Sequence, residues 1–291
     1  MKYLIALRPF SFIATFIPVT VGALIAQQYS SFSLWLYLIS LVAAICVHAG
    51  VNTSNDYFDY KNGVDRPDTL GSSGLLVKKV ISLKEIMIIS LVMFSTGIAL
   101  GFLLVSYTGF NLLWFGLIGI IGGYFYTAKP LNLKYRGFGL PLVFLLMGPF
   151  MVMGAEYVQA RRLSLSGLIV SIPIGIATVL ILLANEIRDT QDDRKVGLKS
   201  LPILIGDLAG TRLYLFLVLL QYLMTAILIF TNVLSRLSWL SLFALPVYLA
   251  VYHQLSGKAY KKFSPEDISG TDKKTAMAEM IFGASLIIGL L

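Results

Sequence analysis

Residues 34–65 of the chain read LWLYLISLVAAICVHAGVNTSNDYFDYKNGVD, an apolar run that ends in a stretch rich in Asn and Asp. The apolar part has the length of about 20 residues that an α-helix needs to cross the hydrocarbon core of a bilayer. At about 100° per residue, Asn52, Asn55, Asp56 and Asp59 share one side of such a helix. The stretch therefore predicts a membrane-spanning helix whose polar stripe emerges at one membrane face.

The whole chain has the same apolar character. Its 291 residues are 57% hydrophobic and 13% charged, with a mean hydropathy of +0.81, which is too apolar for a soluble domain of this size. The pattern predicts an all-α, multi-pass membrane protein. Its nine predicted transmembrane helices lie at roughly 10–28, 34–54, 83–106, 110–127, 138–159, 166–187, 208–231, 236–255 and 275–291.

The positive charges alternate between the predicted loops. All of the 23 Lys and Arg residues except Arg161, Arg162 and Arg236 lie at the N-terminus or in every second loop. The positive-inside rule then places the N-terminus and these loops in the cytoplasm and the C-terminus outside, in a plasma or inner membrane. The net charge of +8 is thus explained by membrane topology, and no nucleic-acid partner is expected.

A second acidic cluster, NEIRDTQDDRKVGLKS at 185–200, ends the sixth predicted span. Its Asn185, Asp189 and Asp193 are spaced i, i+4 and i+8, so they share one helix face. Four predicted spans separate the two clusters, and an even number of crossings returns the chain to the same side of the membrane. We therefore expect both clusters on the cytoplasmic face.

The matched clusters also hint at an internal repeat. Asn55 and Asn185 each have an Asp four residues further on. We read the chain as a single transmembrane domain over 1–291, with a possible four-helix pseudo-repeat at about 10–127 and 138–255.

Crowded carboxylates at a membrane boundary repel one another and are costly unless a cation neutralises them. Oxygen donors without His or Cys select hard cations, and Mg²⁺ is commonly held by one or two carboxylates together with substrate phosphates. The loop YFYTAKPLNLKYRGFG at 124–139 adds groups that bind phosphate oxygens, namely Lys129, Lys134, Arg136 and the Tyr126 hydroxyl. The pattern indicates a Mg²⁺-bound diphosphate, although solvated helix ends and ordinary loop composition would also account for each feature taken alone.

Together these motifs resemble the UbiA superfamily of intramembrane prenyltransferases. The resemblance is carried by NDxxDxxxxxD from Asn55 to Asp65, NxxxDxxxD from Asn185 to Asp193, the loop at 124–139 and the opening LRPFSF at 7–12. The loop, the segment GPFMVMGAEYVQ at 148–159 and the GVD that ends the first motif are most similar to the menaquinone-forming branch. That branch prenylates 1,4-dihydroxy-2-naphthoate, whereas KVGLKS after the second motif is closer to the 4-hydroxybenzoate branch.

The resemblance implies nine helices around a central cavity, a bound Mg²⁺, a polyprenyl diphosphate donor and an aromatic acceptor. It implies the metal residues Asn55, Asp56, Asp59, Asp189 and Asp193. The implied catalytic residues are Asp59, Asp65, Asp189, Asp193 and Lys134, and the implied diphosphate contacts are Tyr126, Lys129, Lys134 and Arg136.

Two kinds of alternative stay open from the sequence. The acceptor is 4-hydroxybenzoate, haem, chlorophyll or an archaeal lipid precursor in other branches of the superfamily. A membrane transporter, a different class of protein, also carries intramembrane acidic groups and repeats. Carriers usually place such charges near the bilayer midplane, whereas here they lie at predicted helix ends, which favours the enzyme.

Overall fold

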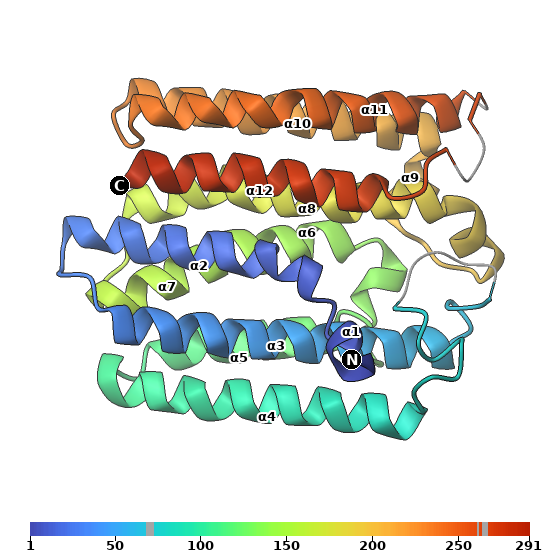
Figure 1. Cartoon of the computed structure of the whole chain (residues 1–291), viewed down its shortest axis with the longest axis horizontal. Coiled ribbons are helices and arrows are strands. Elements are labelled where there is room, and N and C mark those ends of the chain that lie inside the picture. Colours follow the sequence, from blue (N-terminus) through green and yellow to red (C-terminus); the bar gives the residue numbers. More distant parts are fainter. Residues whose placement is uncertain (68–72, 261, 264–266) are drawn as a thin grey trace.

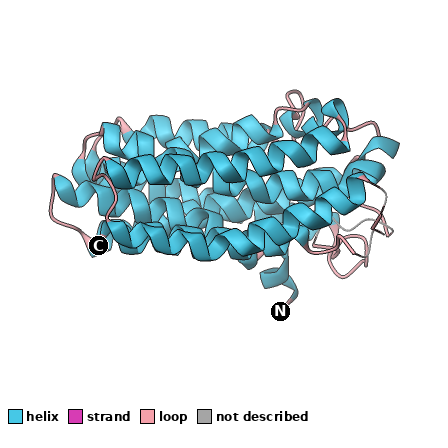
Figure 2. Ribbon diagram, turned by 90° about the horizontal axis from the view of Figure 1, so that it is seen from above, coloured by secondary structure: helices cyan, strands magenta, loops and turns pink. Residues whose placement is uncertain are grey.

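The computed structural model describes residues 1–67, 73–260, 262–263 and 267–291. These residues form helices and loops, and the long helices lie side by side in one bundle (Figure 1). Seen from above, the helices run nearly parallel along the length of the molecule (Figure 2). The all-α prediction is confirmed.

The helical elements follow the predicted segments along the chain. In order they are α1 (Lys2–Ala6), η1 (Pro9–Phe12), α2 (Ile13–Ile25), η2 (Ala26–Gln28), α3 (Leu34–Lys61), α4 (Leu83–Thr108), α5 (Leu112–Phe125), η3 (Leu133–Arg136), α6 (Gly139–Leu145), η4 (Leu146–Phe150), α7 (Met151–Ala160), α8 (Leu165–Lys195), α9 (Leu201–Ile205), α10 (Asp207–Phe230), η5 (Arg236–Ala244), α11 (Leu245–Ala259) and α12 (Thr271–Leu290).

Six of these helical stretches are long and apolar enough to cross a membrane. They are Pro9–Gln28, Leu34–Lys61, Leu83–Thr108, Gly139–Ala160, Leu165–Lys195 and Asp207–Phe230, and Leu112–Phe125 is a shorter apolar helix. The prediction of a multi-pass membrane protein is confirmed. The count of nine spans and the division into two four-helix repeats stay predictions.

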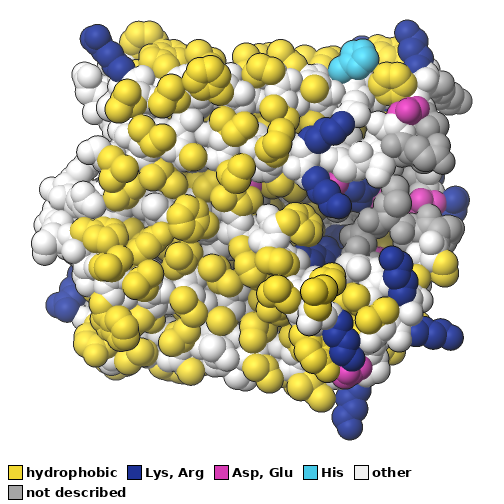
Figure 3. Space-filling model, viewed as in Figure 1, with side chains coloured by type: hydrophobic (Ala, Val, Ile, Leu, Met, Phe, Trp, Pro, Cys, Tyr) yellow, Lys and Arg dark blue, Asp and Glu magenta, His cyan; other side chains and the backbone are white. Residues whose placement is uncertain are grey.

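The two ends of the bundle differ in their loops and charges. The described parts of the loops that follow α3, α5, α8 and α11 lie toward the right-hand end in Figure 1, and the C-terminus lies at the left-hand end. Dark-blue Lys and Arg side chains gather toward the right-hand end of the face shown in Figure 3, while hydrophobic side chains cover most of the rest. The described parts of both acidic motifs therefore share one end of the bundle, as predicted.

Helix α8, which carries the second motif, lies at the centre of the fold. In the most apolar 18-residue stretch of α8, 72% of the residues are buried, whereas 28% are buried in the corresponding stretches of α3 and α4. Its neighbour across Gly175 is the π-helical turn η4, where a Cβ on Gly148 would lie 2.7 Å from the Gly175 Cα. The two backbones thus touch, which only glycine permits. This contact sets the position of α8 against η4.

Candidate active site

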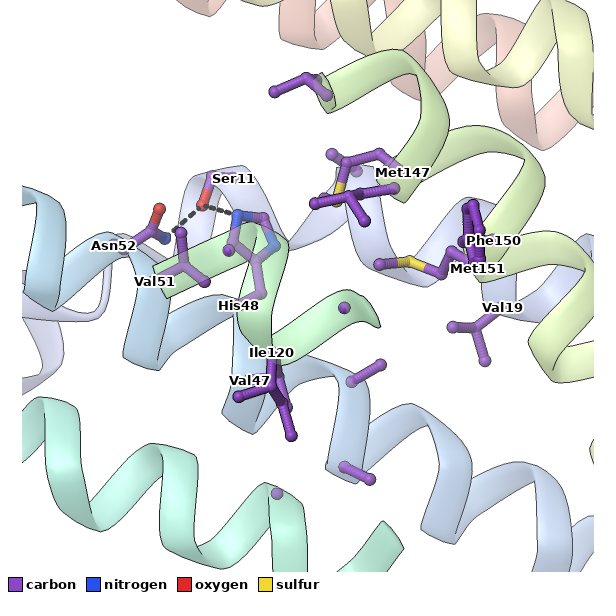
Figure 4. A pocket seen from close by; sticks show the side chains of 18 of the residues that line it. Ser11, Val19, Val47, His48, Val51, Asn52, Ile120, Met147, Phe150 and Met151 are labelled. Carbon is purple, nitrogen blue, oxygen red and sulfur yellow. Dashed lines mark hydrogen bonds between the residues drawn. The ribbon is translucent and has the colours of Figure 1, made fainter. Parts of the chain in front are cut away.

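A cavity of about 1460 Å³ opens between α3, α5, η4, α7 and α8. Its wall is mostly apolar, and part of it is seen from close by in Figure 4. Side chains that form this apolar part include Val47, Val51, Ile120, Met147, Phe150 and Met151. Polar groups gather at one end, where Asn55, Asp59, Tyr126, Lys134 and Asn185 line the cavity.

The first motif lies at the C-terminal end of α3. Helix α3 ends at Lys61, and Gly63 adopts the positive φ of +72° that favours glycine. After this turn the backbone N–H groups of Val64 and Asp65 donate to the carbonyl oxygen of Asp59, at 2.8 and 3.3 Å. The predicted break at Gly63 is confirmed, and Asp65 is folded back beside the motif.

The carboxylate of Asp59 is held by the loop between α5 and α6. Lys134 donates to its Oδ2 at 2.7 Å, and the Tyr135 hydroxyl donates to its Oδ1 at 2.5 Å. Partial burial alone would lower the pKa of Lys134, but the adjacent Asp59 carboxylate raises it well above its ordinary value. Lys134 is therefore a fixed positive charge at the polar end of the cavity. Beside it, Thr127 donates to Asn55 Oδ1 at 2.5 Å.

Asp56 and Asp65 are the other two carboxylates of the first motif. The Arg8 guanidinium pairs with Asp56 Oδ1, and the Ser73 hydroxyl donates to Asp56 Oδ2 at 2.5 Å. Asp65 is 7% exposed, and burial raises its pKa to about 7, with further increases from the charges of Asp59 and Asp56. The negative charges of Asp56 and Asp59 thus act on Asp65, as expected from the sequence.

The second motif is organised by an arginine inside it. Arg188 grips Asp189 through two hydrogen bonds, from Nε at 2.7 Å and from Nη2 at 2.8 Å, and the same Nη2 donates to Asn185 Oδ1. Its Nη1 also pairs with Asp272 at the start of α12, at 2.8 Å. This fork geometry is the one in which Arg binds a carboxylate most strongly.

The structure brings the two motifs to one space. Asn55 and Asp59 from α3 and Asn185 from α8 line the same cavity. Burial raises the pKa of the Tyr126 hydroxyl, and Lys134 opposes that rise. The negative charges of Asp59 on α3 and Asp193 on α8 both add to the rise in the pKa of Tyr126, so residues of both acidic motifs lie near it.

The donor set fits Mg²⁺ that is bound together with a diphosphate. The predicted metal residues offer only oxygen atoms, which Mg²⁺ prefers. Among the residues that the structure describes, no three His, Cys, Asp or Glu side chains are close enough to hold one ion. The described residues therefore form no preformed cage of ligands for a metal ion. One or two carboxylates from each motif, with phosphate oxygens and water completing the shell, match the way Mg²⁺ is usually bound.

Two of the predicted phosphate contacts lie apart from the cavity. Lys129 and Arg136 are exposed, and the Arg136 guanidinium donates to the carbonyl of Pro130 at 3.0 Å. Lys134 and Tyr126 do line the cavity, together with Asn55 and Asp59. The structure thus separates an inner pair of phosphate-binding candidates from an outer pair, and the roles of both pairs stay predictions.

Sequence reasoning missed several partners of the acidic motifs. Four side chains each bind one of the predicted carboxylates, and nothing in the sequence led us to expect these contacts. They are those of Arg8, Ser73, Tyr135 and Arg188. A usable signal existed for Arg188, because it stands between Asn185 and Asp189 in the motif. The others lie outside the motifs, and their partners follow only from the packing.

The chain is similar over its length to known proteins. Residues 15–264 match the model of the UbiA prenyltransferase family. A 1,4-dihydroxy-2-naphthoate octaprenyltransferase of Bacillus subtilis (strain 168) is 31% identical, covering 98% of this chain and 90% of that protein. The human UbiA prenyltransferase domain-containing protein 1 is 28% identical, covering 100% and 83%.

Solved structures share the fold at low sequence identity. A UbiA homologue from Archaeoglobus fulgidus, solved with GPP and Mg²⁺ bound, has a TM-score of 0.64 at 16% identity and covers 99% of this chain and 100% of its own. Another, from Aeropyrum pernix K1 in its apo form, has a TM-score of 0.71 at 16% identity, with 96% and 98% covered. From the family match and the 31% identical relative, the chain belongs to the UbiA prenyltransferase family.

Proposed function

We propose that this protein transfers an isoprenoid chain from a polyprenyl diphosphate to 1,4-dihydroxy-2-naphthoate, a step of menaquinone biosynthesis, and that it requires Mg²⁺. One observation carries the proposal. Asn55 and Asp59 of the first motif on α3, Asn185 of the second motif on α8, and Lys134 line the polar end of a large cavity whose remaining wall is apolar. Such a cavity suits a molecule with a diphosphate head and a hydrocarbon tail.

The choice of acceptor is supported by similarity over nearly the whole chain to the Bacillus subtilis relative, which acts on this naphthoate according to its name. The solved Archaeoglobus fulgidus homologue supports the donor class, because it binds GPP together with Mg²⁺. We infer the same donor chemistry here from the shared family and from the oxygen-only donor set.

The residues at the polar end have separable tasks. Asn55, Asp59, Asp189 and Asp193 would hold Mg²⁺ against the diphosphate, with Asp56 and Asp65 in support. Bound there, Mg²⁺ would supply Lewis-acid stabilisation of the departing diphosphate. Lys134 donates to the diphosphate oxygens, so its fixed charge stabilises the negative charge that builds up as the allylic C1–O bond breaks. The Tyr126 hydroxyl donates a further hydrogen bond.

The apolar wall serves the second half of the reaction. Breaking the C1–O bond leaves an allylic carbocation, which water would quench. A cavity lined by side chains such as Met147 and Phe150 excludes water from C1. The ring carbon of the naphthoate that bears the carboxylate then bonds to C1. Loss of CO₂ returns the bonding electron pair to the ring and restores its aromaticity.

The charge distribution supports a position for the site in the cell. We propose a multi-pass protein of the plasma or inner membrane with the N-terminus and both acidic motifs on the cytoplasmic side and the C-terminus outside. Single cysteines placed at Lys199 and Leu291 in a Cys46→Ala background test this orientation. Only the Lys199 position should be protected from a membrane-impermeant thiol reagent in intact cells. The reverse labelling pattern contradicts the proposed topology.

An acceptor screen tests the proposed reaction. The purified protein is given an allylic diphosphate and Mg²⁺ with either 1,4-dihydroxy-2-naphthoate or 4-hydroxybenzoate, and products are identified by mass spectrometry. We expect a prenylated naphthoquinol that has lost CO₂, with one diphosphate released per product. Prenylated 4-hydroxybenzoate instead would change the acceptor, and absence of diphosphate release with every acceptor would contradict the enzyme assignment.

A further inference from the structure

A small polar group interrupts the apolar wall of the cavity. His48 lies one turn of α3 before Asn52, and both line the cavity with Ser11 of η1 (Figure 4). His48 is seven residues before Asn55, which is about 10 Å along the helix at 1.5 Å per residue. The group therefore lies close to the predicted diphosphate site but on the side of the hydrocarbon cavity, where the bond-forming carbon must sit.

The hydrogen-bond partners of His48 assign its ring hydrogen to Nε2. The Ser11 hydroxyl donates its single proton to the carbonyl oxygen of Arg8 at 2.8 Å. The oxygen of Ser11 is therefore an acceptor toward His48 Nε2, which lies 3.4 Å away. Nε2 then carries the hydrogen in the neutral ring, and Nδ1 accepts from the Thr15 hydroxyl at 2.7 Å.

The contact between His48 Nε2 and Ser11 Oγ is weak enough for a bound ligand to take the place of Ser11. A distance of 3.4 Å is beyond the usual range for an N–H···O bond, so this bond is weak. By contrast, the bond from Thr15 to Nδ1 is short and holds the ring in place. His48 thus presents a fixed N–H donor to the cavity at little cost to its present contacts.

Asn52 presents the complementary group. Its amide nitrogen donates to the carbonyl of Leu7 at 3.1 Å and to Ser11 Oγ at 3.0 Å, which engages both of its N–H groups. The oxygen Oδ1 is what Asn52 offers as an acceptor. A donor on His48 and an acceptor on Asn52, one helical turn apart, match a hydroxyl group, which both accepts and donates.

We propose that His48 Nε2–H and Asn52 Oδ1 form a subsite for a phenolic hydroxyl of the aromatic acceptor. The subsite rests on the proposed function, since it names where that acceptor binds. The subsite orients the aromatic ring of the acceptor. The phenolic hydroxyl contacts α3, and the reacting carbon faces the diphosphate end of the cavity. His48 and Asn52 act as substrate-binding and positioning residues, and they take no part in breaking the C1–O bond.

The same segment connects this subsite to the acidic motif. Ser11 binds the carbonyl of Arg8, and the Arg8 guanidinium pairs with Asp56. Arg8 has the positive φ of 56°, so the chain turns sharply between the two contacts. This turn is shared by the proposed acceptor subsite and the acidic motif. It places acceptor and donor sites at a fixed separation.

A matched pair of ligands and variants tests the subsite. Calorimetry on the purified full-length chain compares 1-hydroxy-2-naphthoate with 1-methoxy-2-naphthoate, whose oxygen cannot donate. We expect the wild type to bind the hydroxy compound about tenfold more tightly, the range for one or two hydrogen bonds. His48→Leu should lose this preference, and His48→Gln, which keeps an N–H donor, should retain most of it. His253→Leu is the matched control, because His253 is the other histidine and is exposed.

A purely structural role for His48 would change stability without changing the preference between the two ligands. If His48→Leu binds the hydroxy compound with the wild-type preference, or the wild type shows no preference, the subsite is wrong. If His48→Leu does not fold, Thr15→Val replaces it, because loss of the bond to Nδ1 frees the tautomer and should reduce the preference about threefold. An unchanged preference in Thr15→Val would then overturn the proposal.

Turnover separates this proposal from the proposed function. With an allylic diphosphate, Mg²⁺ and 1,4-dihydroxy-2-naphthoate, His48→Leu should raise the KM for the naphthoate about tenfold and leave the KM for the diphosphate unchanged. Failure of the wild type to form any prenylated product would overturn the function while the binding preference still reports on the subsite. Product formation with an unchanged naphthoate KM in His48→Leu would overturn the subsite alone.

Discussion

The ammonium nitrogen of Lys134 lies 2.7 Å from Asp59 Oδ2, across 75 residues of sequence. A predicted phosphate-binding cation and a predicted metal-binding carboxylate thus neutralise each other. Under the proposed function, Asp59 would pair with Mg²⁺ and Lys134 with a phosphate oxygen when the diphosphate binds. Both charges would then stay paired, which limits the cost of holding them in a partly buried site.

Replacing Lys134 tests its role as a fixed charge. Lys134→Met should lower kcat about 100-fold or more, because charge developing on the leaving diphosphate loses a positioned donor. Mg²⁺-dependent diphosphate release is the measurement. Lys199→Met is the control, since Lys199 is an exposed lysine at the same end of the molecule. Equal rates for both variants would contradict the assignment.

Removing a predicted metal ligand from either motif should abolish turnover. Asp59→Ala and Asp189→Ala each remove a predicted ligand carboxylate, one from each motif, and both proteins should still be found in the membrane fraction. Asp192→Ala is the matched control on α8, because Asp192 pairs with Lys195 at the surface, at 2.7 Å. Normal activity in either site variant, measured by product formation, would exclude that residue as an essential ligand.

Asp65 should make the stability of the metal-free protein depend on pH. Burial raises its pKa from 3.8 to about 7, so the folded state binds a proton that the unfolded chain releases between these values. Stability from this group is therefore lost as pH rises toward 7 and above. With EDTA present, Asp65→Asn should raise Tm above that of the wild type by a few degrees at pH 8, and the difference should shrink toward pH 5. A difference that is constant or grows at low pH contradicts the shift.

The cavity wall should limit the length of the isoprenoid. Gly119 on α5 lines the cavity, and a Cβ added there would meet nothing within 4 Å. Gly119→Ala should therefore be tolerated, whereas the ring in Gly119→Phe occupies space that a long hydrocarbon tail needs. We expect kcat/KM for a long polyprenyl diphosphate to fall at least about tenfold relative to geranyl diphosphate in Gly119→Phe. A parallel fall for both donors would show that the tail does not pass Gly119.

Local sequence properties predicted the helices well. Each predicted span coincides with a helix or a continuous run of helical elements, because hydropathy over about 20 residues and the helical period are properties of neighbours in the chain. The turn at Gly63 followed from the freedom of glycine at positive φ. The loop sequence did not show which of the predicted phosphate contacts line the cavity, since nothing in it distinguishes the inner Lys134 from the exposed Lys129.

The sequence by itself determined that two acidic motifs end two membrane-length helices, because span length and hydropathy are properties of neighbouring residues. Only the tertiary structure decided which charges meet. Arg8 reaches Asp56 across 48 residues, and Arg188 reaches Asp272 on another helix. Such contacts depend on how helices rotate and pack against one another, and residues far apart in the chain have no local signal that specifies it.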